Sequence, residues 1–371
     1  MTKTFHLLTV AMAAFSLFAC TKEHSDVAPD NQKTISVMVY INSPTINSNT
    51  IGGSLPDGTV VSIQRGMVFF LSSEGIVLSY GIINTEQILA GQLFSGIKTS
   101  ASEVYIVANY APLSTTEAKL KACTSKADIQ AVSETMVELT GVPFPILANA
   151  SDLTGFDAAK YDNKIKGETS IKDACVLLSP ILSRIEITEI KTEDPMIVSF
   201  TMAGLYVDNF FPSIYMACGK GGAGSKIFGG TALNNLNNAA FVHKDKTTPT
   251  SKNGKLTPSD NLSVIWVYHT APTLGGAINI PRLVVVLSSV TIKVNGVTSI
   301  VTNKFLTVTG FKDSNNALIQ NFEAGKIYNS PRNGFVFKYS DLADTPNPPR
   351  ADVTVNVEVK SWVDRAYSPE I

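Results

Sequence analysis

The sequence contains few charged side chains and few of the residues that usually carry chemistry. Charged residues make up 16% of the 371 residues and the formal net charge is −1, so no basic surface indicates a nucleic-acid partner. Of the four histidines, His6 and His24 fall at the start of the chain, and His243 and His269 stand apart with no Cys or acidic cluster nearby. The composition therefore favours neither a metal site nor histidine-based catalysis.

Motifs for catalysis and cofactor binding are also missing. The glycine-rich residues 219–226 place Ser225 before Lys226, the reverse of the P-loop order, and no helical pattern follows. There is no Gly-x-Ser-x-Gly elbow, whereas scattered carboxylates leave a glycosidase pair open. Three cysteines follow Cys20 at spacings that match no zinc site, and either one disulfide or only free thiols would fit: Cys123, Cys175 and Cys218. We expect that the chain has no enzymatic activity and binds no cofactor and no metal.

The chain has one extended apolar run, over residues 5–19. It is too short for a transmembrane helix, which needs about 20 apolar residues. A positively charged start followed by a run of this length predicts a signal peptide over residues 1–19.

The run ends at Leu17-Phe18-Ala19-Cys20, which resembles the bacterial lipobox, where a small residue precedes a cysteine that is acylated. Phe18 is bulkier than the usual residue at its position. We predict lipid modification of Cys20, with a polar tether after it and lipid as the membrane anchor. An ordinary signal peptide with an incidental cysteine is the alternative.

Alternating apolar and polar residues dominate the rest of the chain and predict half-buried strands. One helical region is expected over residues 115–136, beginning with a capping box of Ser114 and Glu117, or else dividing so that Thr124 or Ser125 caps a second helix. Many strands with few helices predict an all-β fold of β-sandwiches. The predicted strands include residues 35–41, 66–72, 76–82, 104–109, 181–190, 197–208, 263–269, 282–289, 290–294 and 353–359.

The last predicted strand has the clearest alternation, with polar residues between four valines that should share one face: Val353, Val355, Val357 and Val359. Three prolines within residues 346–349 stiffen its approach and could free it from its own domain. Trp362 follows. With Trp266 and Tyr268 it could form a sugar platform, although packing within the sheets is favoured for these side chains.

Three segments, taken in their order and spacing, resemble the fimbrillins, the subunits of type V pili of Bacteroidales. Residues 104–109 are similar to the family's strand that ends in Ala-Asn before a helix, residues 182–190 resemble its Arg-containing strand, and residues 351–363 resemble its final strand. The resemblance implies two transthyretin-like β-sandwich domains with one or two short helices.

The implied organisation divides the chain into four parts. After the signal peptide, residues 20–65 hold the lipidated tether and a removable first strand. Residues 66–170 would form the N-terminal sandwich, and residues 171–371 would form the C-terminal sandwich with the terminal donor strand.

The resemblance also implies assembly by donor-strand exchange. A lipidated precursor reaches the outer membrane, an Arg-specific protease removes the N-terminal segment, and a C-terminal strand of the next subunit fills the groove that is left. Here the donor would hold the four alternating valines. The removable strand would hold Ile35, Val37, Val39 and Ile41.

We expect the protease to cut between Arg65 and Gly66. The family's cut usually lies in the loop after the first strand, but residues 42–59 contain neither Arg nor Lys, and no other arginine precedes Arg184. Alternatively, Arg65 is an ordinary strand-end residue, and the uncut chain is a lipid-retained anchor subunit.

The expected function is that of a structural subunit of a cell-surface fimbria, made as an outer-membrane lipoprotein precursor and supporting adhesion. Its partners would be other fimbrial subunits, in a homo- or hetero-polymer, and a host protein or glycan is a further candidate. A surface lipoprotein that binds glycans without polymerising is the alternative from another class.

Overall fold

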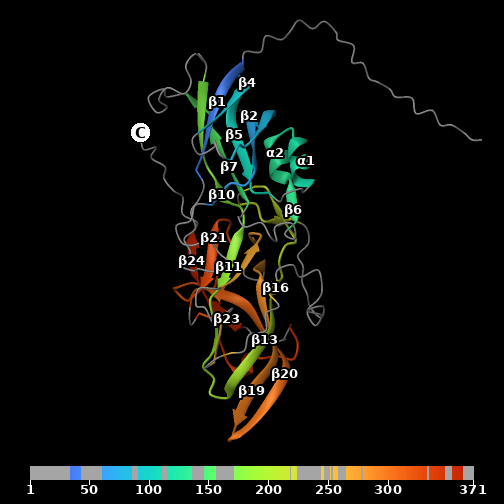
Figure 1. Ribbon diagram of the computed structural model, residues 1–371, viewed down its shortest axis with the longest axis vertical. Coiled ribbons are helices and arrows are strands. Elements are labelled where there is room, and N and C mark those ends of the chain that lie inside the picture. The colour runs from blue at the N-terminus through green and yellow to red at the C-terminus, as the bar shows by residue number, and fades with distance from the viewer. Residues whose placement is uncertain are drawn as a thin grey trace, which may run out of the picture. The chain divides into compact units, whose positions relative to one another are not determined.

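The computed structural model describes residues 34–42, 61–85, 91–110, 115–135, 146–155, 171–217, 219–223, 244–245, 251, 254–257, 265–276, 279–331, 334–346 and 353–361. The predicted signal peptide and Cys20 lie outside these ranges. The chain from Thr34 onward forms one compact unit. Strands dominate and two short α-helices accompany them, so the prediction of an all-β fold is confirmed (Figure 1). No described helix is long and apolar enough to cross a bilayer.

Two sheets pack face to face around the core of the first half. One has the strand order β4-β1-β9-β8 and the other β10-β7-β5-β2-β3. Their strands are β1 (Thr34–Asn42), β2 (Gly66–Ser72), β3 (Val77–Ile82), β4 (Gln92–Lys98), β5 (Ala101–Ala108), β7 (Leu147–Asp152), β8 (Thr154–Gly155), β9 (Ile171–Leu177) and β10 (Ser179–Pro180).

The second half has a sandwich of its own, in which the order β18-β11-β21-β24 faces the order β16-β13-β19-β20-β23 across a large apolar core. A small sheet, β17-β12-β22, lies beside them. The strands are β11 (Ser183–Ile187), β12 (Ile190–Thr192), β13 (Ile197–Asp208), β16 (Lys244–Asp245), β17 (Lys255–Leu256), β18 (Trp266–Thr270), β19 (Arg282–Val294), β20 (Val297–Lys312), β21 (Lys326–Ser330), β22 (Val336–Phe337), β23 (Val353–Asn356) and β24 (Glu358–Ser361). A 3₁₀ turn, Tyr339–Asp341, lies between β22 and β23 in the chain.

The helical region divides in two, as one of the two sequence interpretations predicted. Helices α1 (Thr115–Lys121) and α2 (Lys126–Ala131) pack apolar side chains on the outer face of the sheet that holds β2 and β5. The Ser125 side chain accepts a hydrogen bond from the Asp128 backbone N–H, and the Asp128 carboxylate accepts one from the Ser125 backbone N–H, which completes a capping box for α2. Ser114 lies outside the described residues.

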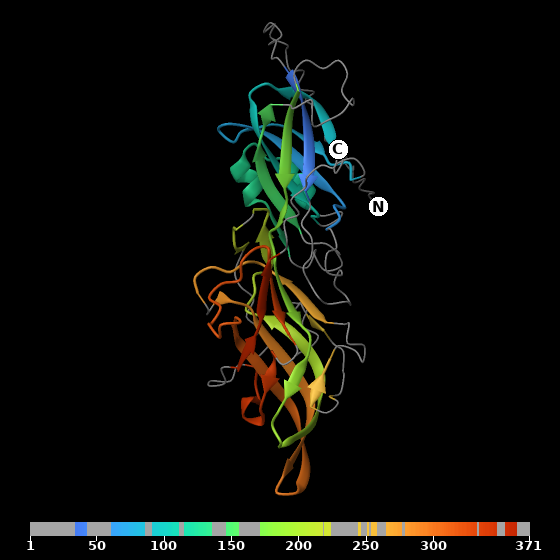
Figure 2. The ribbon, with the colours of Figure 1, turned by 90° about the vertical axis from the view of Figure 1, so that its left-hand side faces the viewer.

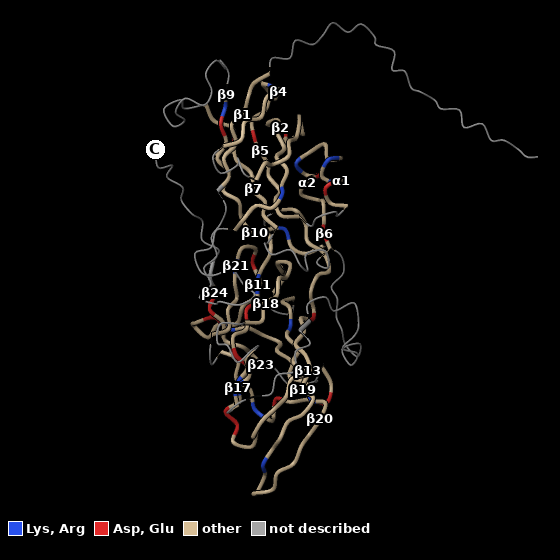
Figure 3. The backbone as a smooth tube through the Cα atoms, in the orientation of Figure 1, with Lys and Arg blue, Asp and Glu red and all other residues tan. Residues whose placement is uncertain are grey.

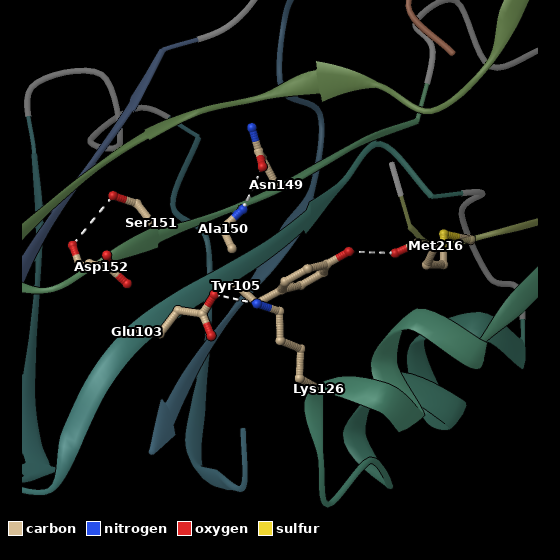
Figure 4. Close-up of polar contacts among 8 residues, drawn as sticks. All are labelled: Glu103, Tyr105, Lys126, Asn149, Ala150, Ser151, Asp152 and Met216. Atoms are coloured by element: carbon tan, nitrogen blue, oxygen red, sulfur yellow. Dashed lines mark hydrogen bonds and ion pairs between the residues drawn. The ribbon is translucent and has the colours of Figure 1, made fainter. Parts of the chain in front are cut away.

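The helices and the second half are tied to β5 by polar contacts (Figure 4). The Lys126 ammonium of α2 forms an ion pair with Glu103. The Tyr105 hydroxyl donates a hydrogen bond of 2.9 Å to the carbonyl of Met216. A second small sheet links the same regions, with the order β15 (Gly222–Ala223), β14 (Ser213–Tyr215) and β6 (Ser133–Thr135).

Sheet membership changes later in the chain than the predicted boundary at 170/171. Strand β9 lies beside β1, and β10 pairs with β7, so the sheets of the first half extend to Pro180. The first strand of the second sandwich is β11, which begins at Ser183. Because the chain from Thr34 onward is one compact unit, a division into two independent domains stays a prediction.

Candidate functional site

Strand β1 lies in the middle of its sheet. It runs antiparallel to β4 on one side and parallel to β9 on the other, and Figure 2 shows the blue β1 and the green β9 side by side. Both backbone edges of β1 are therefore hydrogen-bonded. Removing this strand would leave two facing strands with unpaired N–H and C=O groups.

The alternating side chains of β1 are part of the core, as the period of two predicts. All four are buried, and they pack against the opposite sheet, whose contributions include Phe70 and Val104. They are the residues placed in the removable strand from the sequence: Ile35, Val37, Val39 and Ile41. Loss of β1 would thus open an apolar groove one strand wide.

The flanks of β1 carry a requirement that the sequence did not reveal. Gly91, just before β4, has φ 91°, and a Cβ there would lie 2.4 Å from the Tyr40 ring of β1. A residue with a side chain would be strained at this φ and would also collide with the ring. The backbone at the start of β4 can therefore lie this close to β1 only because residue 91 is glycine.

The candidate cleavage site lies at the start of β2. The Arg65 carbonyl accepts a hydrogen bond of 2.9 Å from the Asn109 N–H, and the Gly66 carbonyl accepts one of 2.9 Å from the Ile83 N–H. Gly66 is buried. A protease needs an extended, accessible segment. This peptide bond could therefore be cut only after the first residues of β2 separate locally from their hydrogen-bond partners.

The Arg65 side chain lies beside a buried tyrosine. Its guanidinium carbon is 5.9 Å from the centroid of the Tyr110 ring, within the range of a cation–π contact. Burial, and then the charge of Glu117, raise the pKa of Tyr110 to about 12, and Arg65 acts in the opposite direction. Tyr110 is therefore neutral at physiological pH and presents an uncharged ring to Arg65.

The terminal segment changes sheets, in contrast to the single strand expected from its alternation. β23 runs parallel to β20, and β24 runs antiparallel to β21. The change falls at Val357, whose N–H donates a hydrogen bond of 2.8 Å to the carbonyl of Lys312. Both β23 and β24 are edge strands, so each is paired on one side among the described residues.

The four valines of this segment do not share one environment. Val355 and Val357 are 0% and 2% exposed and belong to the core of the second sandwich, whereas Val359 is 44% exposed. The side chain of Val353 is outside the described part. The expected common face is wrong for Val359 because the switch of sheets turns β24 relative to β23. The proline-containing segment before β23 is also held to β20 at Pro346, because the Thr307 hydroxyl donates a hydrogen bond to the Pro346 carbonyl.

The remaining candidate residues from the sequence, aromatic side chains and cysteines, lie in the core, elsewhere in the described residues or outside the described ranges. Trp266 and Tyr268 are buried in the second sandwich, as favoured from the sequence, and Trp362 lies outside the described ranges. Cys123 and Cys175 form no disulfide, and Cys218 is not described. Within the described ranges no cluster of His, Cys, Asp and Glu could hold a metal ion. Charged residues are scattered along the tan backbone in Figure 3.

Comparison with known proteins finds solved structures of similar fold but no relative by sequence. No protein-family model and no curated protein sequence matches the chain. Among solved structures, two proteins from Parabacteroides distasonis ATCC 8503 that are described as candidate cell adhesion proteins superpose on this chain. Their TM-scores are 0.57 and 0.55, each at 12% identity. The superpositions cover 89% of this chain and 100% and 97% of those chains.

The fimbrilin FimA of Porphyromonas gingivalis W83 superposes with a TM-score of 0.50 at 10% identity, covering 89% of this chain and 98% of that one. The chain therefore has the all-β fold of the fimbrillins, over nearly the full length of these neighbours. The resemblance noted from three sequence segments is confirmed at the level of fold.

Proposed function

We propose that this chain is a structural subunit of a type V fimbria, exported as a lipoprotein precursor with Cys20 acylated and polymerised at the cell surface by donor-strand exchange. The observation that carries the proposal is the central position of β1. It is the first described strand, it lies between β4 and β9, and it places four side chains in the core. Because every other described strand follows β1 in the chain, one cut between β1 and β2 would release it without interrupting the others.

Loss of β1 would leave the first sandwich incomplete. Burying one Val or Ile side chain contributes about 1.5–3 kcal/mol, and four such side chains leave the core together. The backbone groups of β4 and β9 that faced β1 would also lose their partners, which is costly away from water. A subunit in this state gains from binding any strand with alternating apolar residues.

The terminal segment supplies such a strand from a place where it can be released. Because β23 and β24 are edge strands, each has a single partner strand, so their departure breaks the pairing with β20 and β21 and the hydrogen bond from the Asn356 N–H to the Gly334 carbonyl. Val355 and Val357 must leave their own core, and an equivalent burial in the neighbour's groove offsets that loss. Each subunit then accepts one strand and donates another, and repetition of this head-to-tail contact produces a filament.

The geometry of the cleavage site favours a second candidate from the same system. Arg65 and Gly66 are held by backbone hydrogen bonds on both sides of the peptide bond, which would slow proteolysis of the folded precursor. A chain that stays uncut keeps its own β1 and its lipid, and it would serve as an anchor subunit. N-terminal sequencing of the surface-assembled protein separates the two, because a start at Gly66 supports the polymerising subunit.

The exposed thiol of Cys175, which is in no disulfide, offers a direct test of strand exchange. Cys175 is exposed on β9 opposite Tyr40 of β1, so a donor in the place of β1 brings one of its outward-facing residues beside this thiol. We would introduce single cysteines at the polar donor positions, as Thr354→Cys, Asn356→Cys and Glu358→Cys. Neighbouring strands hold Cα atoms within the range of about 4.4–6.8 Å that a disulfide requires.

One of the three variants should give polymers whose bands become covalent under oxidation and separate again on reduction. Cys175→Ser in the same variant is the matched control and should abolish the covalent bands. Polymers that form normally but never cross-link to Cys175 in any of the three variants would show that the terminal segment does not occupy the position of β1.

A further inference from the structure

Strands β19 and β20 form a long hairpin whose end projects beyond the neighbouring strands (Figure 2, orange). Asn295 and Gly296 connect them, with φ of 49° and 81°. Positive φ at both central residues is the requirement of the tight hairpin turn that matches strand twist. The turn therefore fixes the register out to its last pair, Val294 with Val297.

The outer edge of β20 is open near this turn. On that side β23 pairs with residues from Val308 to Lys312, and Phe305 bridges to Ala343. For residues 297–302, no strand among the described residues lies on the side away from β19. Every second residue of such an edge directs its N–H and C=O outward, where another strand could bind them.

The open edge lacks the features that usually prevent strand addition. Its sequence, Val-Thr-Ser-Ile-Val-Thr, has no charge and no proline, whereas exposed edges normally carry Lys, Pro or a bulge. Val297 is 69% exposed and Ile300 is 66% exposed. The nearest bulge-like feature is Asn303, with φ 54°, and it lies at the inner end of the segment.

We propose that residues 297–302 pair edge to edge with the same residues of a second copy of this chain, in the antiparallel direction. A two-fold axis through Ile300 would place Ile300 opposite its copy and Thr298 opposite Thr302. Cross-strand pairs between β-branched residues and between threonines stabilise sheets. The two hairpins would then form one continuous sheet across the contact.

The chemistry of the edge favours a second copy as the occupant. Self-pairing brings like residues together, and it is not penalised here because the segment is uncharged. The next charged side chain, Lys304, forms an ion pair with Asp344 of its own chain, so it does not add an unpaired charge at the contact. A two-fold contact uses one patch on both partners, and therefore a single edge is sufficient to build it.

A pairing of about six residues is small, and interfaces well below about 1,200 Å² are typically weak. It would join filaments side by side rather than extend them, because each subunit of a filament would repeat the edge and weak contacts add. That consequence depends on the proposed polymer, but the pairing itself does not. It can be tested on the uncut precursor, which keeps β1 and cannot accept a donor strand.

The test is disulfide trapping in the purified exported precursor at high concentration. Ile300→Cys should give a reducible covalent dimer, because its Cα faces its own copy. Thr298→Cys alone should not, since its copy lies about four residues away along the strand, but a mixture of Thr298→Cys with Thr302→Cys should. The unaltered chain measures the background from its native cysteines.

Sedimentation analysis tests the same contact without cysteines. Ile300→Lys should weaken the self-association of the precursor at least tenfold, because two charges would meet at the axis. Leu274→Lys, at an exposed apolar residue off this edge, should leave it unchanged. A strictly monomeric precursor, or equal trapping by Ile300→Cys and Thr298→Cys, would overturn the proposal, and neither result would bear on strand exchange.

Discussion

Arg184 and Glu186 of β11 are the most deeply buried charged pair in the described residues. They are 3% and 0% exposed, their Nε and Oε1 atoms are 2.7 Å apart, and the Asn329 amide donates a further hydrogen bond of 2.6 Å to Glu186. Burial lowers the pKa of Arg184, and Glu186 opposes that shift. The network joins β11 to β21, the strand that pairs with β24, so it holds β21 in place if the terminal segment leaves.

Removing one member of this pair should therefore be costly. Arg184→Met leaves a buried carboxylate without its counter-charge, and we expect a loss of about 3–5 kcal/mol in the free energy of unfolding. Chemical denaturation of the exported protein measures it. The double variant Arg184→Met with Glu186→Met should be clearly more stable than the single one, and an equally unstable double variant would contradict an electrostatic origin.

The capping box of α2 gives a second prediction at this scale. Ser125→Ala removes the side chain that accepts from the Asp128 N–H, and loss of such a cap costs about 1 kcal/mol. Hydrogen bonds from Thr124 and then Ser125 hold the pKa of Asp128 below its usual value. A lowered pKa stabilises the fold above the unfolded-state value, and this contribution is lost as pH falls through the folded-state value.

Thermal unfolding of the wild type and Ser125→Ala between neutral and acid pH would check both statements. The difference between the two proteins should shrink in acid, because protonation of Asp128 weakens the same cap in the wild type. A difference in thermal stability between the two proteins that stays constant with pH would show that the charge of Asp128 does not contribute to the cap.

At the scale of elements, the terminal segment makes a prediction that its sequence alone could not. Val355 is fully buried and Val359 is 44% exposed, although both alternate with polar residues. Val355→Asp would bury a charge in the molecule's own core, which is strongly unfavourable, and should reduce the yield of folded protein. Val359→Asp should leave the monomer stable.

The proposed exchange treats the same two variants differently. In the neighbour's groove both positions would face apolar side chains, so Val359→Asp should block polymer growth while leaving export and thermal stability close to those of the wild type. Val359→Ile is the matched control and should polymerise. High-mass ladders on unboiled gels that persist in Val359→Asp would place residue 359 outside the groove.

Strands with strict alternation or long apolar runs could be predicted from the sequence, since burial of one face determines their period. β13 was predicted over the residues it occupies, and β1 was placed correctly at its apolar centre. β20 was not predicted, although Asn295-Gly296 between two apolar stretches is a strong hairpin signal, because its outer half carries exposed residues. The sheet switch at Val357 depends on partners far along the chain, which no local pattern encodes.

For the whole molecule, the proposed function makes the step from precursor to polymer depend on one peptide bond. Arg65 is the only arginine ahead of Arg184, so Arg65→Ala should abolish cutting by an Arg-specific protease and leave the precursor on the cell with β1 in place. The fold should tolerate the change, because the cation–π contact with Tyr110 is worth about 0.5–1 kcal/mol at a partly exposed site.

Arg65→Lys is the stricter variant, since it keeps a cation over the Tyr110 ring and changes only the residue that the protease reads. We expect both variants to accumulate as full-length precursor with no ladder, detected by immunoblot of unboiled surface extracts. Wild type should show the ladder and an N-terminus at Gly66. If Arg65→Lys still polymerises and its N-terminus lies elsewhere before β2, β1 is removed at another bond and the groove hypothesis survives. If it polymerises with β1 retained, the central strand is not exchanged, and the subunits must be joined through other surfaces.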